Sequence, residues 1–278
     1  MKLEKIWAVY FSGTGTTRRT VERIAGGIAS RLNLPAESVD FSRPAVRQET
    51  LGFGEKDLVV FGTPVYAGRV PNVLLPFLRE RIVGGGALAV PVVLFGNRNY
   101  DDALIELRNI LAADGMHPIA AGAFVGEHSF SRVLGADRPN AEDEALMDEF
   151  AARVAALAAG LDAAPVKSVA VRGQEPLRPY YTPRDRAGNP INILKVKPKT
   201  DLSRCGGCGL CADLCPMGSI DPADVSAVRG ICIKCCACVK GCPTGAKFFD
   251  DAGYLYHQHE LEAQYARPAE NEVFYIQL

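Results

Sequence analysis

The sequence predicts an α/β protein with two units: a doubly wound domain built on a five-stranded parallel sheet, and a small cysteine-rich unit that follows it. Over the first 160 residues, short apolar runs alternate with amphipathic segments. This pattern is expected of strands and helices around a parallel sheet. All nine cysteines lie between residues 205 and 242. At 278 residues, the chain has room for both units.

Five segments predict the strands of the sheet. Four are short apolar runs, as expected of strands that are buried on both faces. A weaker segment fills the interval after the first predicted helix. In chain order, the five cover residues 5–11, 38–41, 57–62, 87–96 and 118–126.

Four further segments predict the helices that cover the sheet. The first spans residues 17–32, where Val21, Ile24, Ile28 and Leu32 recur at helical spacing. The second and third span residues 72–82 and 103–115. The fourth, over residues 141–160, is amphipathic and has an acidic first turn, which suits the positive end of a helix.

Charge and hydropathy narrow the class of protein. The net charge of −1 gives no general reason to expect nucleic acid or a membrane as partner. The apolar run at residues 6–12 is too short for a signal peptide, and no run reaches the roughly 18 apolar residues of a membrane helix. We therefore expect a cytoplasmic protein with reduced thiols, in which clustered cysteines favour metal over disulfides.

Eight cysteines form two runs with the spacing C-x2-C-x2-C-x3-C, and each run is followed by proline. The spacing is typical of bacterial ferredoxins with two [4Fe–4S] clusters, in which the fourth cysteine of each run ligates the other cluster. Residues 201–249 resemble that family. The predicted ligands of one cluster are Cys205, Cys208, Cys211 and Cys242, and those of the other are Cys232, Cys235, Cys238 and Cys215.

Structural zinc is the alternative interpretation of these cysteines. Cys208 with Cys211, and Cys232 with Cys235, can be taken as two zinc-binding pairs. That interpretation leaves the other four cysteines of the runs and both prolines without a role. The ninth cysteine, Cys236, falls outside the spacing, and we interpret it as a small buried residue beside a cluster.

Residues 12–17, with the sequence SGTGTT, join the first predicted strand to the first predicted helix. Backbone N–H groups, four hydroxyls and the helix dipole at this point would suit a phosphate. The loop has neither the GK[ST] end of a nucleotide P-loop nor a GxGxxG motif. Hydroxyls without a lysine favour a phosphomonoester over a triphosphate, and an ordinary turn is the alternative.

Four loops together resemble those of the flavodoxin family: residues 12–17, 62–71, 96–104 and 126–131. The resemblance implies the cofactor FMN. It places the phosphate on Ser12, Thr14, Gly15, Thr16 and Thr17. It places the flavin ring between two loops that contribute Thr63, Pro64, Val65, Tyr66 and Gly68, and Gly96, Asn97, Arg98, Tyr100 and Asp101.

Two details of the resemblance concern the flavin ring. Tyr66 and Tyr100 are the candidates for stacking on the ring, and Tyr100 matches the family's stacking tyrosine better. Arg69 and Arg98 depart from the family pattern, since flavodoxins tend to hold acidic residues near the flavin. We therefore expect a less negative flavin potential.

The sequence divides into residues 1–160, a linker at 161–200, the cluster unit at 201–250 and a C-terminal extension at 251–278. The linker has six prolines and a net charge of +5, whereas residues 201–278 have a net charge of −4. A solvated linker is the default expectation, and the alternative is that it lies against the acidic unit. Residues 191–197 and 272–278 are candidates for additional strands.

These features predict an electron-transfer flavoprotein that relays electrons between FMN and two [4Fe–4S] clusters, with redox proteins as donors and acceptors. The alternatives are an FMN-dependent oxidoreductase that reduces a small substrate, and a binding module with structural metal. We expect the cluster unit to dock beside the strand-end loops, near Tyr66 and Tyr100. The sequence does not indicate the oligomeric state.

Overall fold

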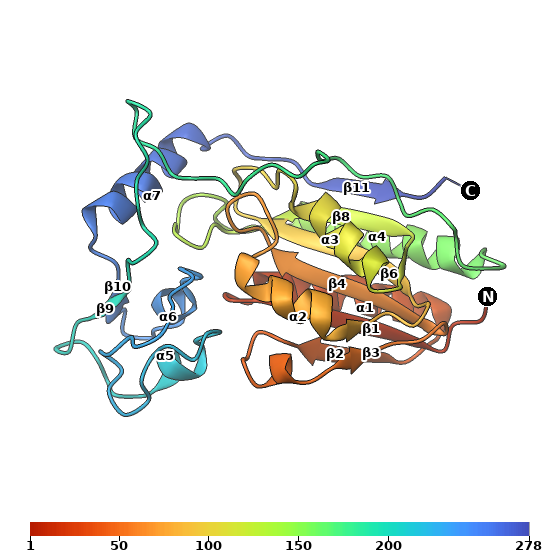
Figure 1. Ribbon diagram of the computed structural model, residues 1–278, viewed down its shortest axis with the longest axis horizontal. Coiled ribbons are helices and arrows are strands. Elements are labelled where there is room, and N and C mark those ends of the chain that lie inside the picture. Colours follow the sequence, from red (N-terminus) through yellow and green to blue (C-terminus); the bar gives the residue numbers. More distant parts are fainter. Residues whose placement is uncertain (278) are drawn as a thin grey trace.

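The computed structural model describes residues 1–277. Five parallel strands form the centre of the first domain, in the spatial order β2-β1-β4-β6-β8 (Figure 1). All five coincide with the predicted segments, with bounds Lys5–Tyr10 for β1, Ala36–Asp40 for β2, Asp57–Pro64 for β4, Leu88–Phe95 for β6 and Ala120–Val125 for β8. The order changes direction at β1, which places the switch point, where open α/β sheets bind ligands, between β1 and β4.

The sheet is larger than the five strands expected from the sequence. β11 (Glu272–Tyr275) pairs antiparallel with the edge strand β8, and β7 (His117–Pro118) pairs with β6. A separate two-residue pair joins β3 (Leu51–Gly52) to β5 (Ile82–Val83). The prediction of a strand near the C-terminus is confirmed over β11, although residue 278 lies outside the described residues.

The prediction of a strand at residues 191–197 is wrong. The Asn192 side chain accepts a hydrogen bond from the backbone N–H of Leu194 at 3.0 Å, and Val196 N–H bonds to the Ile193 carbonyl at 3.1 Å. These local bonds turn the chain, because an asparagine side chain offers the backbone an alternative to sheet pairing.

Helices cover both faces of the sheet and create two apolar cores. α1 (Thr16–Leu32) and α4 (Ala141–Ala159) pack on one face. α2 (Leu75–Glu80), preceded by the short 3-10 helix Asn72–Leu74, and α3 (Ala103–Ala113) pack on the other. A second 3-10 helix covers Val46–Gln48. No helix in residues 1–277 is long and apolar enough to cross a membrane.

The cysteine-rich unit contains little regular structure. β9 (Lys199–Thr200) pairs with β10 (Lys247–Phe248), and between them lie α5 (Leu210–Asp213) and α6 (Ala237–Lys240). The two short helices are 27 residues apart, so the sequence repeat is also a structural repeat. α7 (Ala252–Gln264) follows. Figure 1 shows this unit beside one end of the sheet.

Residues 161–198, which we call the strap, run along the first domain, although most of their side chains are exposed. The buried carboxylate of Asp102 pairs with Arg178 and accepts backbone N–H bonds from Gln174 at 3.0 Å and Arg178 at 2.8 Å. These bonds, above all those from Arg178, lower the pKa of Asp102. Tyr181 N–H also bonds to the Ala67 carbonyl at 2.9 Å. The linker is thus attached to the first domain at particular residues and remains solvated along most of its length.

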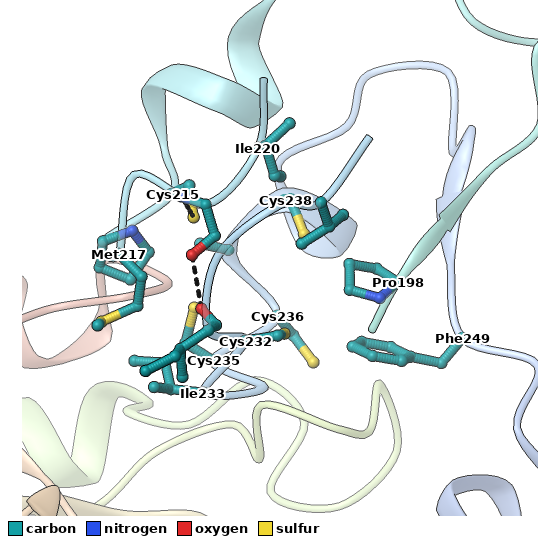
Figure 2. A pocket seen from close by; sticks show the side chains of 15 residues that line it. Pro198, Cys215, Met217, Ile220, Cys232, Ile233, Cys235, Cys236, Cys238 and Phe249 are labelled. Carbon is teal, nitrogen blue, oxygen red and sulfur yellow. Dashed lines mark hydrogen bonds between the residues drawn. The ribbon is translucent and has the colours of Figure 1, made fainter. Parts of the chain in front are cut away.

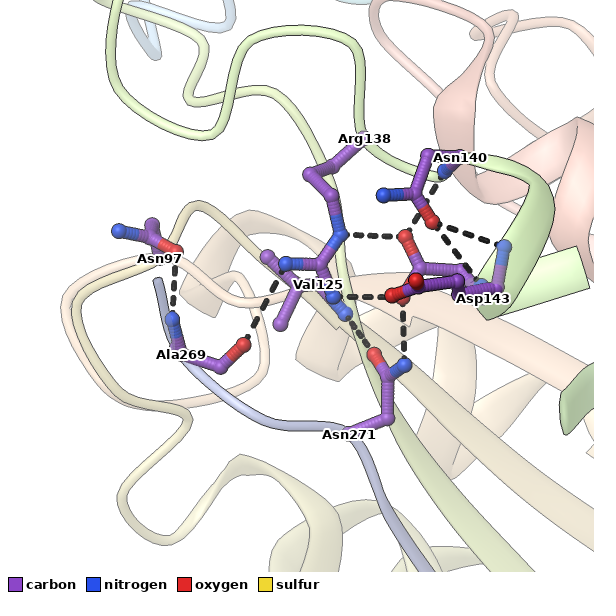
Figure 3. Close-up of polar contacts among 8 residues, drawn as sticks. Asn97, Val125, Arg138, Asn140, Asp143, Ala269 and Asn271 are labelled. Atoms are coloured by element: carbon purple, nitrogen blue, oxygen red, sulfur yellow. Dashed lines mark hydrogen bonds and ion pairs between the residues drawn. The ribbon is translucent and has the colours of Figure 1, made fainter. Parts of the chain in front are cut away.

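Residues 265–275, the C-terminal arm, return from the cysteine-rich unit to the sheet. The Asn97 amide donates to the carbonyl of Tyr265 at 2.6 Å and accepts from Ala269 N–H at 2.9 Å. Farther along, Asn271 accepts from Val125 N–H at 2.8 Å and donates to Asp143 at 2.6 Å (Figure 3). The strap and the arm thus attach the cysteine-rich unit to the first domain at both of its ends.

Candidate functional site

A cavity of about 480 Å³ opens at the carboxyl ends of the parallel strands. Thr14, Thr16 and Thr17 of the predicted phosphate loop line it, together with residues that follow β4, β6 and β8. Strand-end loops converge here because parallel strands all end at the same edge of the sheet. The predicted phosphate loop, residues 12–17, therefore lies at the switch point of the sheet.

The start of α1 fits a phosphate. Gly15 at its N-cap has φ +87° and offers no side-chain cap to the first N–H groups of the helix. The Ser12 hydroxyl accepts from Arg18 N–H at 3.2 Å, so it binds the first turn of the helix instead of lining the cavity. The remaining N–H groups at the start of this 17-residue helix, next to three threonines that line the cavity, suit a phosphomonoester.

A larger cleft adjoins this cavity, and the two share Val65, Tyr66, Phe95, Gly96, His128 and Ser129. The cleft lies between the two loops that the flavodoxin resemblance assigns to the flavin ring. Of the residues predicted there, Val65, Tyr66, Gly68, Gly96 and Arg98 line the cleft, and Pro64 lines the adjoining cavity.

The structure does not bring Tyr100 to the cleft. Its ring is fully buried, its hydroxyl donates to Glu272 of β11 at 2.7 Å, and the Arg172 guanidinium lies 4.4 Å from its ring centre. A ring enclosed in this way has no free face for stacking. Of the two predicted stacking residues, only Tyr66 is placed at the cleft.

Other predicted residues have structural surroundings of their own. Asn97 holds the C-terminal arm, and Asp101 forms an ion pair with Arg98. Thr63 is fully buried and its hydroxyl has no partner among the described residues. Arg69 forms a bidentate pair with buried Glu106, with both N–O distances at 2.7 Å, so its charge is neutralised. Of the two arginines expected near the flavin, Arg98 alone lines the cleft.

The cleft has walls that the sequence did not indicate. The strap contributes Tyr180 and Tyr181, α7 contributes His257, and Lys234 comes from the second cysteine run. The Tyr181 ring stacks on His257 with centres 6.0 Å apart. The only sequence signal was the adjacent tyrosine pair in an otherwise basic, proline-rich segment.

Two histidines beside the cleft are held neutral. Burial lowers the pKa of His128 to about 3, with a further contribution from the positive charge of Lys240. Burial, with Arg98 nearby, lowers the pKa of His257 to about 4. Neutral imidazoles suit hydrogen bonding at the rim of the cleft at physiological pH.

The eight predicted cluster ligands divide between two cavities, as the exchanged pattern predicts. We call the first the distal cavity, of about 560 Å³, which is lined by Cys205, Cys208, Cys211 and Cys242. The second is the proximal cavity, of about 370 Å³, which is lined by Cys215, Cys232, Cys235 and Cys238, with Cys236 also at its wall. Figure 2 shows the thiols of the proximal cavity with apolar side chains around them.

Corresponding backbone N–H groups point at the two exchanged cysteines. Ser219 N–H bonds to the sulfur of Cys215 at 3.3 Å, and Ala246 N–H bonds to that of Cys242 at 3.2 Å. Both donors lie four residues after their cysteine. Such bonds orient metal-bound thiolates and tune the metal.

The chemistry of the two cavities fits iron–sulfur clusters. Within residues 1–277, no group of three or more Cys, His, Asp or Glu side chains is arranged so that it could hold a single metal ion. A cubane cluster requires a different arrangement, because each of its four thiolates binds a different iron. Burial raises the pKa of Cys235 and Cys238 to about 12, so these thiols require bound metal to remain deprotonated.

The proximal cavity lies directly against the strand-end loops. Cys235 lines both the proximal cavity and the phosphate-loop cavity, and Cys232 lines the cleft. Lys240 of α6 forms an ion pair with Glu127 and donates to the His128 carbonyl at 2.7 Å.

A second polar contact between the two units involves Arg47, which follows β2. Its guanidinium donates to the Pro216 carbonyl at 2.5 Å, next to Cys215, and to the Ser42 carbonyl at 2.6 Å. The cysteine-rich unit therefore docks at the strand-end loops, near Tyr66 but away from Tyr100.

Residues 161–200, the basic segment, form ion pairs with both parts of the chain. Arg178 pairs with Asp102 of the first domain. Arg172, Arg186 and Lys199 pair with Glu272, Glu260 and Asp250, all within the acidic residues 201–278. The segment therefore contacts the acidic part of the chain, although beyond the cluster ligands.

Comparison with known proteins gives a matching division of the chain. A flavodoxin domain model matches residues 8–103, and a 4Fe-4S binding domain model matches residues 198–221. A search of curated proteins found no match.

Solved structures match part of this chain at low sequence identity. An archaeal flavodoxin is 17% identical and covers 55% of this chain and 97% of its own, with a TM-score of 0.41. A Fusobacterium nucleatum flavodoxin variant bound to flavin mononucleotide is 14% identical and covers 55% of this chain and 95% of its own, with a TM-score of 0.36. An apo NADH:FMN oxidoreductase is 17% identical and covers 56% and 89%, with a TM-score of 0.39.

Proposed function

We propose that this chain, which joins a flavodoxin domain to a 4Fe-4S binding domain, relays electrons between FMN and two [4Fe–4S] clusters held in the distal and proximal cavities. The observation that carries the proposal is the position of Cys235, which lines both the proximal cavity and the cavity at the phosphate loop. A cluster ligand thus forms part of the wall of the flavin-binding region.

The two cavities suggest an order for the relay. Cys208 of the distal cavity is exposed, whereas Cys235 and Cys238 of the proximal cavity are buried. A redox protein therefore has access to the distal side, and the proximal side faces the cleft. When bound, FMN supplies two-electron chemistry that can be divided into single-electron steps, which suits one-electron carriers.

The chain's own residues position these groups. The N–H groups at the start of α1, with Thr14 and Thr16, bind the phosphate, and Tyr66 contacts the flavin ring. The cysteine-rich unit, the strap and α7 cover the cleft and reduce access of water to it. We expect the protein in the cytoplasm, where the cluster thiols stay reduced before metal binds.

Intramolecular transfer is tested by rapid reduction from the cluster side. Protein loaded anaerobically with about eight iron per chain and with FMN is mixed with a limiting one-electron donor, and flavin absorbance is followed. Flavin reduction should have a phase whose rate does not depend on protein concentration. A rate that falls in proportion to dilution would show transfer between molecules and would overturn the proposal.

Phosphate recognition is tested separately by ligand binding. FMN should bind far more tightly than riboflavin, because riboflavin lacks the phosphate. Changing Thr14 and Thr16 to Val should weaken FMN binding and leave riboflavin binding nearly unchanged. Equal affinities for the two flavins would contradict the assignment of residues 12–17.

The lining of the cleft supports a second candidate, an oxidoreductase that reduces a small substrate at the flavin. Beyond the loops assigned to the flavin ring, the cleft is lined by Tyr181, His257 and Lys234. These side chains offer a small substrate aromatic and hydrogen-bonding contacts beside the ring. Tight binding of a small molecule to the FMN-loaded protein, accompanied by its reduction, would favour this candidate over a pure carrier.

A further inference from the structure

The phosphate loop meets the cysteine-rich unit at Gly13. A Cβ atom on Gly13 would lie 3.0 Å from Cβ of Cys235, 3.6 Å from the Cys235 carbonyl and 3.5 Å from the Tyr66 hydroxyl. Carbon atoms in favourable contact are about 3.5–4.0 Å apart. Any residue with a Cβ atom would therefore push the cluster-ligand loop away by a few tenths of an ångström.

Tyr66 lies at the same point and lines both the cleft and the phosphate-loop cavity. Its backbone is fixed by a reciprocal pair of hydrogen bonds with Arg69, at 2.9 and 3.1 Å. Its hydroxyl lies beside Cys235, because the Tyr66 hydroxyl and Cβ of Cys235 are 3.5 and 3.0 Å from the same point, a Cβ atom built on Gly13. The ring thus extends from the flavin loop to the cysteines of the proximal cavity.

We infer that Gly13, Tyr66 and Cys235 form the electron-transfer junction of the molecule, with the Tyr66 ring as the bridge between the proximal cluster and the flavin. The inference rests on the proposed relay and adds the route. One electron leaves the reduced proximal cluster and enters FMN. Two such transfers, with the proximal cluster reduced again between them by a ferredoxin-type donor and with two protons from water, would convert FMN to FMNH2.

The first test compares matched glycine substitutions in the full chain. Gly13→Ala introduces a methyl group against Cys235, whereas Gly26→Ala introduces one on the same loop-and-helix segment with no atom within 4 Å. Gly13→Ala should slow flavin reduction about tenfold, since sub-ångström displacements have large effects on positioned reactions. Gly26→Ala should leave the rate unchanged.

The second test separates the Tyr66 ring from its hydroxyl. Tyr66→Phe keeps the ring and should retain the rate within about twofold, whereas Tyr66→Leu removes it and should slow transfer about tenfold. Iron content and FMN occupancy are measured for each variant, and rates are compared only among fully loaded proteins.

Hydrogen exchange provides a measurement that does not depend on flavin. In cluster-loaded protein without FMN, Gly13→Ala should increase exchange at both residues 12–17 and residues 232–241, and Gly26→Ala should not. Unchanged exchange in Gly13→Ala would overturn the junction, even if that variant loses FMN. Equally fast transfer in wild type, Gly13→Ala and Tyr66→Leu would overturn the junction but leave the proposed relay intact. The absence of transfer in wild type would overturn the relay itself.

Discussion

The two cysteine runs share one spacing but differ in their surroundings. The distal cavity lies near solvent, with Cys208 exposed and no residue of the first domain in its lining. The proximal cavity is set against the strand-end loops, and Cys235 and Cys238 are only 8% and 9% exposed. One repeated motif thus yields an outer site that partners can approach and an inner site enclosed by the rest of the chain.

The two cysteine runs also differ in which residues occupy their left-handed backbone positions. Gly207 and Gly209 of the first run have positive φ values of 68° and 73°. Twenty-seven residues later, Lys234 and Cys236 have φ values of 56° and 59° in the same left-handed region. Residues with a Cβ atom cost roughly 1–2 kcal/mol there, so the inner run carries backbone strain that the outer run avoids.

Packing explains how the inner run tolerates this strain. The Lys234 ammonium donates to the carbonyls of Cys232 at 2.8 Å and Leu194 at 3.1 Å, which joins the run to the strap. Cys236 lies 3.3 Å, sulfur to oxygen, from the Tyr254 hydroxyl of α7. Glycine at either position would lose these contacts, so the side chains that cause strain also attach the inner site to its surroundings.

Ligand exchange between the runs gives the largest expected effect. Cys242→Ala should remove the same cluster as Cys208→Ala, and Cys215→Ala the same cluster as Cys235→Ala, each leaving about four iron per chain. Cys215→Ala and Cys235→Ala leave only the distal cluster and should abolish flavin reduction, whereas Cys242→Ala and Cys208→Ala leave the proximal cluster and should not. Iron analysis and electron paramagnetic resonance check this. Spectra that pair Cys242 with Cys235 would refute the assignment of ligands to the two cavities.

Exposure to air should distinguish the two sites next. Oxidants reach exposed cysteines first, so the distal cluster should decay severalfold faster than the proximal one. The measurement follows both cluster signals during exposure to low oxygen concentrations. Equal decay rates, or earlier loss of the proximal signal, would contradict the outer and inner assignment.

The Lys240–Glu127 ion pair tests how firmly the inner site is attached. Lys240→Met leaves Glu127 and the His128 carbonyl without this cation, and should destabilise docking by about 1–3 kcal/mol. Lys56→Met is the matched control, because the Lys56–Glu4 pair is mostly exposed and should contribute little to stability. Hydrogen exchange in α6 measures the effect, and equal exchange in both variants would show that apolar contact alone holds the unit.

The smallest effect concerns the backbone strain. Gly207→Ala should destabilise the protein by about 1 kcal/mol through strain alone, because no atom lies within 4 Å of the added methyl group. Lys234→Gly relieves strain but loses two hydrogen bonds, so its net effect on unfolding should be close to zero. Denaturation of cluster-loaded protein measures both. An unchanged free energy of unfolding in Gly207→Ala would show that the loop of the outer run relaxes without strain.

Local chemistry determined much of this protein from the sequence alone. Apolar runs predicted four of the five parallel strands, because strand burial depends on residue type over a short window; the fifth, β2, is mostly exposed and was placed only by the interval after the first helix. Cysteine spacing predicted the ligand sets that line the two cavities, since three thiolates of one cluster come from seven consecutive residues. The phosphate loop can be proposed from the sequence for the same reason, as its N–H groups and hydroxyls are adjacent in the chain.

Only the tertiary structure decided which cluster site is the inner one, how the strap runs and which tyrosine reaches the cleft. Tyr66 and Tyr100 both lie in loops that follow a strand, but β11 pairs with β8 and places Glu272 on the Tyr100 hydroxyl. Nothing in the sequence indicated that the strap binds Asp102, which lies 76 residues before Arg178. Such contacts join segments that are distant in sequence, and their free energy depends on burial and geometry that exist only once the chain has folded.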